Sequence, residues 1–374
     1  MWAPVLWILL LVASRVRSTC DKPALPEMTF MLNGANLEWP CPSTRSIYTT
    51  SGRYISKNVI ATRLQIYKDE AFVLMPRYKP GVPFTLGKTS LKSKNCLASL
   101  APFPCWSLQE EGNCDALQSA VDAFLDPNDV LWVLDIGIVN TLEQPVRRCP
   151  PKVVAFDARS GKVVKVIDLS SLVCSASRLQ HLVVDYASDG RMFVYVSDAA
   201  TRAILVWDVT AGRGRRIVLP KAVTENCTRR DVLYLALVRR SCGTSVLYFT
   251  YLSGCKVFSV KVSHLRRGSA HGSIVEVGRK PGPLVLLGTD GGTSIFFRGK
   301  GESDVYMWNT ETQFRPENFL LVQKGGECRL ATQVAPGYKR LMWVLESNFQ
   351  DYIADMVGCV GTSVALHPLV KTCD

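Results

Sequence analysis

The sequence predicts an all-β protein, a six-bladed β-propeller, from three observations. A triplet of an apolar residue, an aromatic ring and a Val or Phe occurs six times in the 374 residues, every 47 to 63 residues. A tight-turn signal and an earlier apolar run precede most triplets, which is the pattern of a β-hairpin. A third apolar run follows each triplet after the first. Three or four antiparallel strands, repeated six times, are typical of propeller blades.

The six triplets mark the second strand of each blade. Their rings occupy one equivalent position, so we expect them to form core between blades rather than a ligand site, each stabilising the fold by roughly 1.5–3 kcal/mol on burial. The rings are Phe72, Trp132, Tyr195, Tyr248, Phe296 and Trp343.

The remaining strands are predicted around these triplets. Residues Asp115–Phe124 precede a turn and the Trp132 triplet, and are therefore interpreted as the first strand of the second blade rather than as a helix. A fourth strand is expected at Lys162–Leu169. Third strands are expected at Val153–Asp157, Ile204–Asp208, Lys256–Val260, Val305–Asn309 and Tyr352–Ala354.

The first 18 residues have the pattern of a secretory signal peptide. The apolar run Ala3–Ala13 is too short to span a bilayer, and Val16 and Ser18 are small residues placed for cleavage before Thr19. No later segment reaches transmembrane length. We therefore expect residues 19–374 to be a single secreted, extracellular domain with no membrane partner.

All 13 cysteines follow this cleavage site, which fits an oxidising compartment. An odd number leaves at least one thiol free or paired with another chain. Spacing does not fix the connectivity, but Cys114 with Cys149 would brace the second blade, and Cys242 and Cys255 flank one hairpin pair. Asn226 lies in the only N-glycosylation sequon, in a polar stretch between blades.

The net charge of +12, or +10 without the signal peptide, comes mainly from scattered Arg doublets. Such doublets are usually solvated loop ends, although in a secreted protein they also favour encounters with acidic matrix or glycans. No stacking platform or recognition motif accompanies the charge, so nucleic acid is not an expected partner.

No nucleophile elbow, phosphate-binding loop or dinucleotide fingerprint is present, and the four histidines are too few for a His-rich metal site. We therefore expect no cofactor and no metal. A propeller usually works through its central channel. Asp135, Asp198 and Glu346 follow equivalent second strands and are expected at one rim, where converging carboxylates would favour an amine or a cation, unless they bind loop amides instead.

First strands add Gln118, His181 and Thr332 near the same mouth. His181 has the greatest chemical potential because an imidazole can move protons near neutral pH. His181 and Asp135 are thus weak catalytic candidates, and a structural role for the histidine is the alternative.

Several segments resemble the insect Yellow / major royal jelly protein family. They are residues 76–83 (PRYKPGVP), 113–119 (NCDALQS), 131–137 (LWVLDIG) and 149–157 (CPPKVVAFD), with weaker similarity to residues 341–345. Residues 81–87 and 102–106 look most like the eggshell-associated yellow-g branch. The resemblance implies a secreted six-bladed propeller, with family roles in pigmentation, dopachrome conversion, nutrition and amine binding.

Amine-binding members of this family use a Thr of a first strand, together with an Asn and an aromatic residue after the Trp-Val-Leu strand. Thr332 and Phe349 match two of these positions, whereas Ser347 stands where the family commonly has Asn. Losing that amide partner would weaken amine binding by about 1–3 kcal/mol.

Three functions follow as hypotheses. The first is an extracellular-matrix protein of eggshell or cuticle, which would have matrix proteins as partners. The runner-up is a melanin-pathway enzyme of dopachrome-conversion type. The third is a binder of small aromatic amines or indoles in the channel, with Thr332, Ser347, Phe349, Gln118, Asp198 and Glu346 as its candidate ligand-binding residues.

Overall fold

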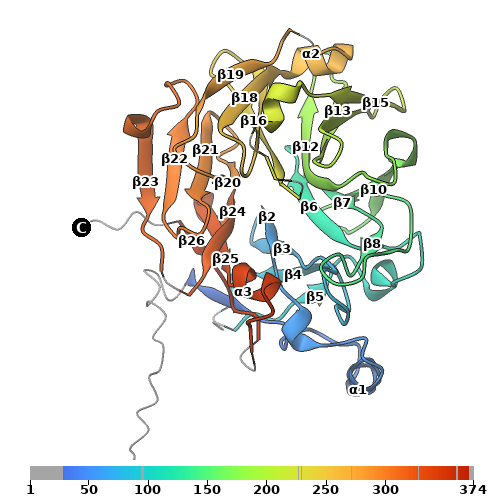
Figure 1. The fold of residues 1–374 in the computed structure, drawn as a ribbon. Coiled ribbons are helices and arrows are strands. Elements are labelled where there is room, and N and C mark those ends of the chain that lie inside the picture. The colour runs from blue at the N-terminus through green and yellow to red at the C-terminus, as the bar shows by residue number, and fades with distance from the viewer. Residues whose placement is uncertain are drawn as a thin grey trace, which may run out of the picture.

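The computed structural model describes residues 28–93, 97–225, 227–228, 230–270, 272–326, 328–358 and 361–369. Six four-stranded antiparallel sheets lie in a ring around one axis (Figure 1). The predicted six-bladed β-propeller is therefore confirmed.

The six blades follow one another along the chain. Blade 1 contains β2 (Arg63–Tyr67), β3 (Glu70–Leu74), β4 (Leu86–Ser90) and β5 (Ala101–Pro102). Blade 2 contains β6 (Ala120–Leu125), β7 (Val130–Asp135), β10 (Lys152–Asp157) and β11 (Val163–Asp168). Blade 3 contains β12 (Leu179–Tyr186), β13 (Met192–Asp198), β14 (Ala203–Asp208) and β15 (Arg213–Val218).

The second half of the ring has the same order, except in its last blade. Blade 4 contains β16 (Leu233–Arg239), β17 (Ser245–Tyr251), β18 (Lys256–Lys261) and β19 (Val275–Arg279). Blade 5 contains β20 (Leu284–Thr289), β21 (Ser294–Gly299), β22 (Val305–Asn309) and β23 (Phe319–Gln323). Blade 6 contains β24 (Leu330–Pro336), β25 (Met342–Ser347), β26 (Val364–Pro368) and β1 (Phe30–Leu32).

The ring closes through its N-terminal strand. β1 pairs antiparallel with β26, with Phe30 opposite Leu366 and Leu32 opposite Val364, so the first strand of the chain becomes the outer strand of the last blade (Figure 1). Phe30 is buried and its ring lies 6.2 Å from that of Trp343. Because closure joins the two ends of the chain, it ties blade 6 to the start of the domain.

The remaining elements are short. β8 (Ile138–Val139) and β9 (Val146–Arg147) form a small ribbon in the loop between β7 and β10. The helices are α1 (Pro42–Thr50), α2 (Val262–Arg267) and α3 (Phe349–Ile353). Single 3-10 turns lie at Ser56–Asn58, Trp106–Gln109, Ser170–Leu172, Lys221–Thr224, Pro316–Asn318 and Tyr338–Arg340.

The six repeated rings are the core between blades, as predicted. All lie on second strands (β3, β7, β13, β17, β21 and β25), and each is at most 2% exposed. Each ring belongs to an apolar cluster that includes residues of the following blade: Phe72 shares its cluster with Leu131, for example, and Trp343, across the closure, shares its cluster with Leu64. The repeat thus gives every blade interface the same large apolar anchor.

Two strand predictions need correction. Residues 352–354, expected as the third strand of blade 6, lie in and just after α3, and the third strand is β26. Tyr352 points inward from this helix, where its hydroxyl donates to Asn58 O at 2.9 Å, whereas Ile353 and Ala354 are exposed, so only one residue of the apolar run is buried. In blade 2 the first strand begins at Ala120, because the preceding residues form a loop.

Chain direction places one end of the channel under a defined set of loops. The inner strands β2, β6, β12, β16, β20 and β24 all begin at the same face, and the loops that follow the second strands lie on that face as well. These loops include residues 75–85 and α3. We call this face the channel mouth.

Candidate functional site

The inner strands place polar side chains in the channel near its mouth. Arg63 belongs to β2, Asp122 to β6, His181 to β12, Tyr234 to β16 and Thr332 to β24. Register irregularities lie at Ala120/Asp122, Leu179/Leu182 and Ala331/Gln333. Bulges of this kind redirect side chains and are common beside functional sites.

Arg63 connects four blades. Its Nη1 donates to Thr332 O at 3.0 Å in blade 6, and its Nη2 lies 3.0 Å from His181 Nε2 in blade 3. Its Nε forms an ion pair with Asp122 Oδ1 in blade 2 at 3.3 Å. The rigid fork of a guanidinium suits this role, because every contact is made by a separate N–H.

The contact with Arg63 determines the protonation of His181. A guanidinium only donates, so Nε2 must accept, and the neutral ring then carries its proton on Nδ1. Burial, followed by the charge of Arg63, lowers the pKa of His181 well below its usual range. Nδ1 is buried and has no hydrogen-bond partner in the described part of the chain. An unpaired buried donor costs about 1–3 kcal/mol, which an acceptor on a ligand would recover.

Asp122 is the acidic group beside this histidine. Its Oδ2 accepts from Leu182 N at 2.8 Å. Burial raises the pKa of Asp122 to about 6, against the opposing effects of Arg63 and the backbone N–H groups. A carboxyl group that titrates near the working pH has the property required of a general base.

Aromatic rings complete the lining. The rings of His181 and Tyr234 lie 4.9 Å apart, and burial raises the pKa of Tyr234 to about 12. At the mouth, Tyr78 from the β3–β4 loop and Phe349 from α3 lie 5.5 Å apart. Burial also raises the pKa of Tyr78. The phenols therefore remain neutral hydrogen-bonding groups, and the rings offer stacking surfaces to a flat ligand.

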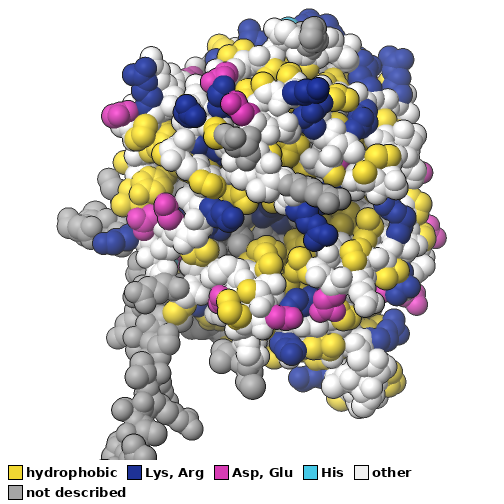
Figure 2. All heavy atoms as spheres, viewed as in Figure 1, with side chains coloured by type: hydrophobic (Ala, Val, Ile, Leu, Met, Phe, Trp, Pro, Cys, Tyr) yellow, Lys and Arg dark blue, Asp and Glu magenta, His cyan; other side chains and the backbone are white. Residues whose placement is uncertain are grey.

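Figure 2 shows one face of the propeller, with a hollow near its middle and Lys and Arg side chains around it.

A second guanidinium lies close to Tyr234. Arg298 of β21 is 8% exposed, and its charge opposes the rise in the Tyr234 pKa. Its Nε donates to Ala331 O at 2.7 Å and its Nη1 to Gly299 O at 2.9 Å. Blade 5 thus contributes a cation to a site that otherwise contains one ion pair.

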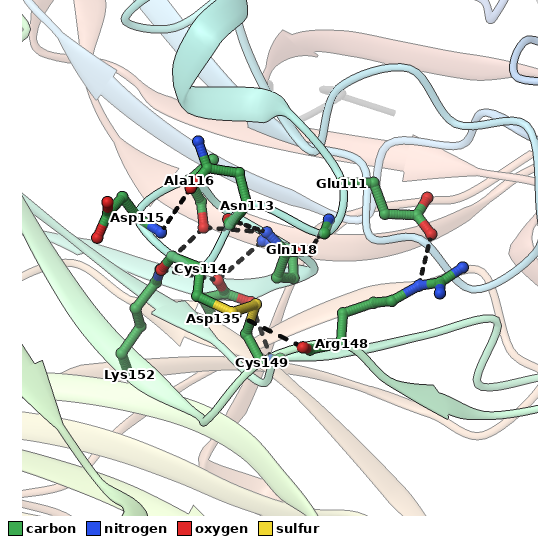
Figure 3. The surroundings of a disulfide bond; sticks show 12 residues. Glu111, Asn113, Cys114, Asp115, Ala116, Gln118, Asp135, Arg148, Cys149 and Lys152 are labelled. Atoms are coloured by element: carbon green, nitrogen blue, oxygen red, sulfur yellow. Dashed lines mark hydrogen bonds and ion pairs between the residues drawn. A yellow bond between two sulfur atoms is a disulfide. The ribbon is translucent and has the colours of Figure 1, made fainter.

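The acids expected at the rim hold their own loops instead of converging on the channel. Asp135 is fully buried and accepts from the backbone N of Gln118 and Ser119, both at 2.8 Å (Figure 3). Asp198, also fully buried, accepts from Arg178 N at 2.9 Å and from the Thr201 hydroxyl. The loop-amide alternative therefore describes these two acids, whose carboxylates already accept hydrogen bonds from backbone N–H groups.

Gln118 and Glu346 are also placed outside the channel lining. The Gln118 amide accepts from Gly112 N and donates to Asn113 O, which fastens the loop before β6 (Figure 3). Glu346 lies between blades, with Oε1 2.7 Å from Gln323 Nε2 and Oε2 3.4 Å from His367 Nε2.

Of the residues suggested by the amine-binding pattern, Thr332, Ser347 and Phe349 lie at the junction of blades 6 and 1. The Thr332 hydroxyl donates to Leu345 O at 3.1 Å, so it is already occupied. The Ser347 hydroxyl is buried without a partner among the described residues, whereas the Thr62 side chain, just before β2, interacts with the Tyr78 phenol and opposes the rise in its pKa. Ser347 is therefore the one of these hydroxyl groups that is left unsatisfied at this junction.

Comparison with known families identifies the chain. The family model described as major royal jelly protein matches residues 118–366, more than half of the sequence. The chain belongs to the major royal jelly protein family. Asp122, His181, Tyr234 and Thr332 fall within the matched residues, whereas Arg63 and Tyr78 precede them.

Curated relatives of this royal jelly family protein include an enzyme. Dopaminechrome tautomerase of Drosophila melanogaster is 30% identical over 172 residues, covering 45% of this chain and 37% of the relative. Major royal jelly protein 7 of Apis mellifera is 34% identical over 146 residues, covering 38% and 32%. Major royal jelly protein 1 of the same bee is 26% identical over 304 residues, covering 74% and 68%. The matches thus span about a third of the first two relatives, and the eggshell-associated branch remains a prediction.

The cysteine predictions have different outcomes. Cys114 and Cys149 form a disulfide between the loop before β6 and the loop before β10, as predicted (Figure 3). Cys242 has an exposed free thiol before β17, whereas Cys255 follows that strand. A seven-residue strand spans roughly 20 Å, so the predicted pairing of Cys242 with Cys255 is wrong.

Two further predictions lie outside the described residues: the signal peptide at residues 1–18 and glycosylation of Asn226. Within the described ranges, no helix is both long enough and apolar enough to cross a bilayer.

Arg63, Asp122, Tyr234 and Arg298 were not predicted from the sequence, and Tyr78 was given no role although it lies in the family-like segment 76–83. The sequence did contain a signal for Arg63, Asp122 and Tyr234. Each is a polar or aromatic residue near the start of an inner strand, at the position where His181 and Thr332 were selected.

Proposed function

We propose that this royal jelly family protein is a tautomerase that acts in its channel on a small quinonoid ring of the aminochrome class. The observation that carries the proposal is the unpartnered Nδ1–H of His181 beside Asp122, whose pKa is near 6. The relative from Drosophila melanogaster, a dopaminechrome tautomerase, supports the same chemistry.

The reaction needs only proton movement. Two protons leave carbons of the five-membered ring and two arrive on the quinone oxygens, so an aminochrome becomes a dihydroxyindole with no net change in atoms or electrons. Asp122 would accept a carbon-bound proton, and His181 Nδ1–H would stabilise negative charge developing on a quinone oxygen. A neutral imidazole that donates in this way is effective because its proton is not lost to solvent.

The test is the disappearance of aminochrome with purified protein. We expect acceleration above buffer, and a rate reduced about 100-fold or more by His181→Ala or Asp122→Asn. Asp135→Asn tests the other residue that the sequence suggested as catalytic. Because Asp135 anchors a loop, we expect this variant to have a lower Tm in thermal unfolding. Equal rates for wild type, His181→Ala and Asp122→Asn would contradict the proposal, and binding of amines without turnover would favour the binding hypothesis.

A second role is suggested by a separate observation. Cys41, Cys105, Cys174 and Cys242 have exposed thiols, and hydrogen bonds from the Ser43 and Thr44 side chains lower the pKa of Cys41 to about 7. We infer that a secreted, basic disc with such thiols is cross-linked into an extracellular matrix of eggshell or cuticle. Two thiols on neighbouring molecules would lose two protons and two electrons to a disulfide oxidant as one S–S bond forms.

Depletion of the protein in follicle or epidermal cells tests this role. We expect a covering that collapses or loses water, antibody labelling of that covering, and extraction of the protein only after reduction. Normal shells and cuticle after complete depletion would count decisively against a matrix role.

A further inference from the structure

A basic pocket lies on the face opposite the channel mouth, where blade 6 meets blade 1. Its volume is about 380 Å³. The β2–β3 turn and the β24–β25 turn form most of its wall, so the length of a strand separates it from the channel mouth. The lining residues are Ile66, Lys68, Asp69, Lys92, Gly337, Tyr338, Lys339 and Arg340.

We call this site the closure pocket, and positive charge is in excess among its lining residues. Four of the lining residues are cations and one is a carboxylate, and that carboxylate, Asp69, already pairs with Lys92 at 3.0 Å. No carboxylate of the described chain lies within ion-pair distance of Lys68, Lys339 or Arg340. The ammonium groups of Lys68 and Lys339 lie 4.7 Å and 5.6 Å from the ring centroids of Tyr67 and Tyr338. Cation–π contacts of this kind retain positive charge at the rim without neutralising it.

The same three cations have unusual backbone geometry. Their φ angles are 54° for Lys68, 58° for Lys339 and 59° for Arg340, in the left-handed region that favours glycine. Only seven non-glycine residues in the described ranges have positive φ, and three of them line this pocket. Strain of this kind costs about 1–3 kcal/mol per residue and concentrates at ligand sites. Lys68, Lys339 and Arg340 therefore occupy positions at which glycine would be the unstrained residue.

The floor of the pocket is apolar and tightly packed. A Cβ added to Gly337 would lie 2.7 Å from Ile66 side-chain atoms, so only glycine allows the two blades to approach this closely. The Tyr338 ring lies beside this floor, and Trp343 Nε1 donates to Tyr338 O at 3.0 Å. A ligand here would meet an aromatic ring and aliphatic surface within a ring of cations.

We propose that the closure pocket binds sulfated sugar units of an acidic extracellular polysaccharide. Sulfate groups would pair with Lys68, Lys339 and Arg340, the three cations that have no carboxylate partner, and the sugar ring would pack on Tyr338 and Ile66. The volume lies at the small end of the range for ligand pockets, which suits one or two sugar units of a longer chain. This site is separate from the channel and does not depend on the tautomerase proposal.

The test uses a variant that removes charge without adding strain. Lys68→Gly, Lys339→Gly and Arg340→Gly together place glycine at three left-handed positions, so the Tm should not fall. The matched control is Lys165→Ser, Lys221→Ser and Lys300→Ser, which removes three exposed lysines elsewhere. Calorimetric titration of the full chain with a heparin-derived tetrasaccharide at physiological salt is expected to give affinity at least about tenfold weaker for the glycine variant, with wild type and control within about twofold.

Titrations with further ligands distinguish a sulfated sugar from other ligand classes. The desulfated tetrasaccharide is expected not to bind, and inorganic sulfate is expected to bind far more weakly than the sugar. Equal affinity of wild type and glycine variant for the tetrasaccharide, or equal binding of the desulfated sugar, would overturn the proposal. The proposal would also be overturned if inositol hexakisphosphate bound more tightly than the tetrasaccharide and the glycine variant lost that binding. If the glycine variant has a lower Tm than the control, asparagine at the same three positions provides the test, because asparagine tolerates this backbone conformation.

Discussion

Arg63 on the first blade and His181 on the third are joined across the channel by a 3.0 Å contact between Nη2 and Nε2. This contact leaves Nδ1 as the protonated nitrogen, and Asp122 holds the guanidinium at 3.3 Å. Three blades therefore determine which nitrogen of one imidazole is available to a ligand. Arg63 is a positioning residue, whereas His181 and Asp122 are the groups proposed to contact substrate.

Replacement of Arg63 by Gln tests this positioning role. Burial and the Arg63 charge both lower the pKa of His181, so removal of the charge should raise that pKa while burial keeps it below its usual range. Titration of the imidazole nitrogens by NMR measures this shift directly. Lys165→Gln, which removes an exposed cation of blade 2, should leave the His181 pKa unchanged. An unchanged pKa in Arg63→Gln would mean that the guanidinium does not control the ring.

The pH dependence of turnover follows from Asp122. Burial raises its pKa to about 6, and the general base must be deprotonated, so kcat/KM should rise as the pH is raised through about 6. His181 should add no inflection near its usual range, because its pKa is well below that range. Initial rates between pH 4.5 and pH 8, on protein shown by circular dichroism to remain folded, provide the profile. A rate that falls above about pH 6 would contradict the assignment of Asp122 as base.

The repeat and the blade cores were predictable because they depend on local patterns. Rings such as Phe72 and Trp343 recur with the same neighbours, and that recurrence alone places them on equivalent strands. The N-terminal strand was not predicted, since Phe30–Leu32 is three residues long and its partner β26 lies at the far end of the chain.

The site was predicted less completely, because it depends on contacts between distant segments. His181 was found by its chemistry. Arg63 and Asp122 are 59 residues apart in the sequence, and only the fold brings their side chains to 3.3 Å from each other. Bulges in the inner strands also change which side chain faces the channel, and a bulge leaves no clear signal in the sequence. Asp135 and Asp198 follow the expected strands, but buried backbone N–H groups in their own loops bind their carboxylates first.

Loss of the Cys114–Cys149 disulfide should destabilise the domain. The bond closes a loop with a sequence separation of 35 residues, for which chain entropy gives about 3–4 kcal/mol. The variant in which both cysteines are replaced by Ser should therefore unfold at lower urea concentration. Cys174→Ser and Cys242→Ser affect exposed thiols and should change stability by no more than about 0.5 kcal/mol. Hydrogen bonds also hold this loop, since Lys152 Nζ donates to Ala116 O at 2.8 Å and Asp135 accepts from Gln118 N at 2.8 Å. A double variant as stable as these controls would show that such hydrogen bonds hold the loop without the disulfide.

Closure of the ring by β1 gives a test in which two neighbouring residues should behave differently. Phe30 is 2% exposed and packs on Trp343, so Phe30→Ala should lower the free energy of unfolding by about 3–5 kcal/mol. Met31 belongs to the same strand but its side chain alternates to the other side and is only half-buried, so Met31→Ala should cost about 1 kcal/mol or less. Urea unfolding followed by tryptophan fluorescence measures both variants. Because closure links the first strand to the last blade, Phe30→Ala should also expose Trp343 before the other blades unfold. Equal losses for the two variants would mean that backbone pairing with β26, rather than this apolar contact, holds the ring closed.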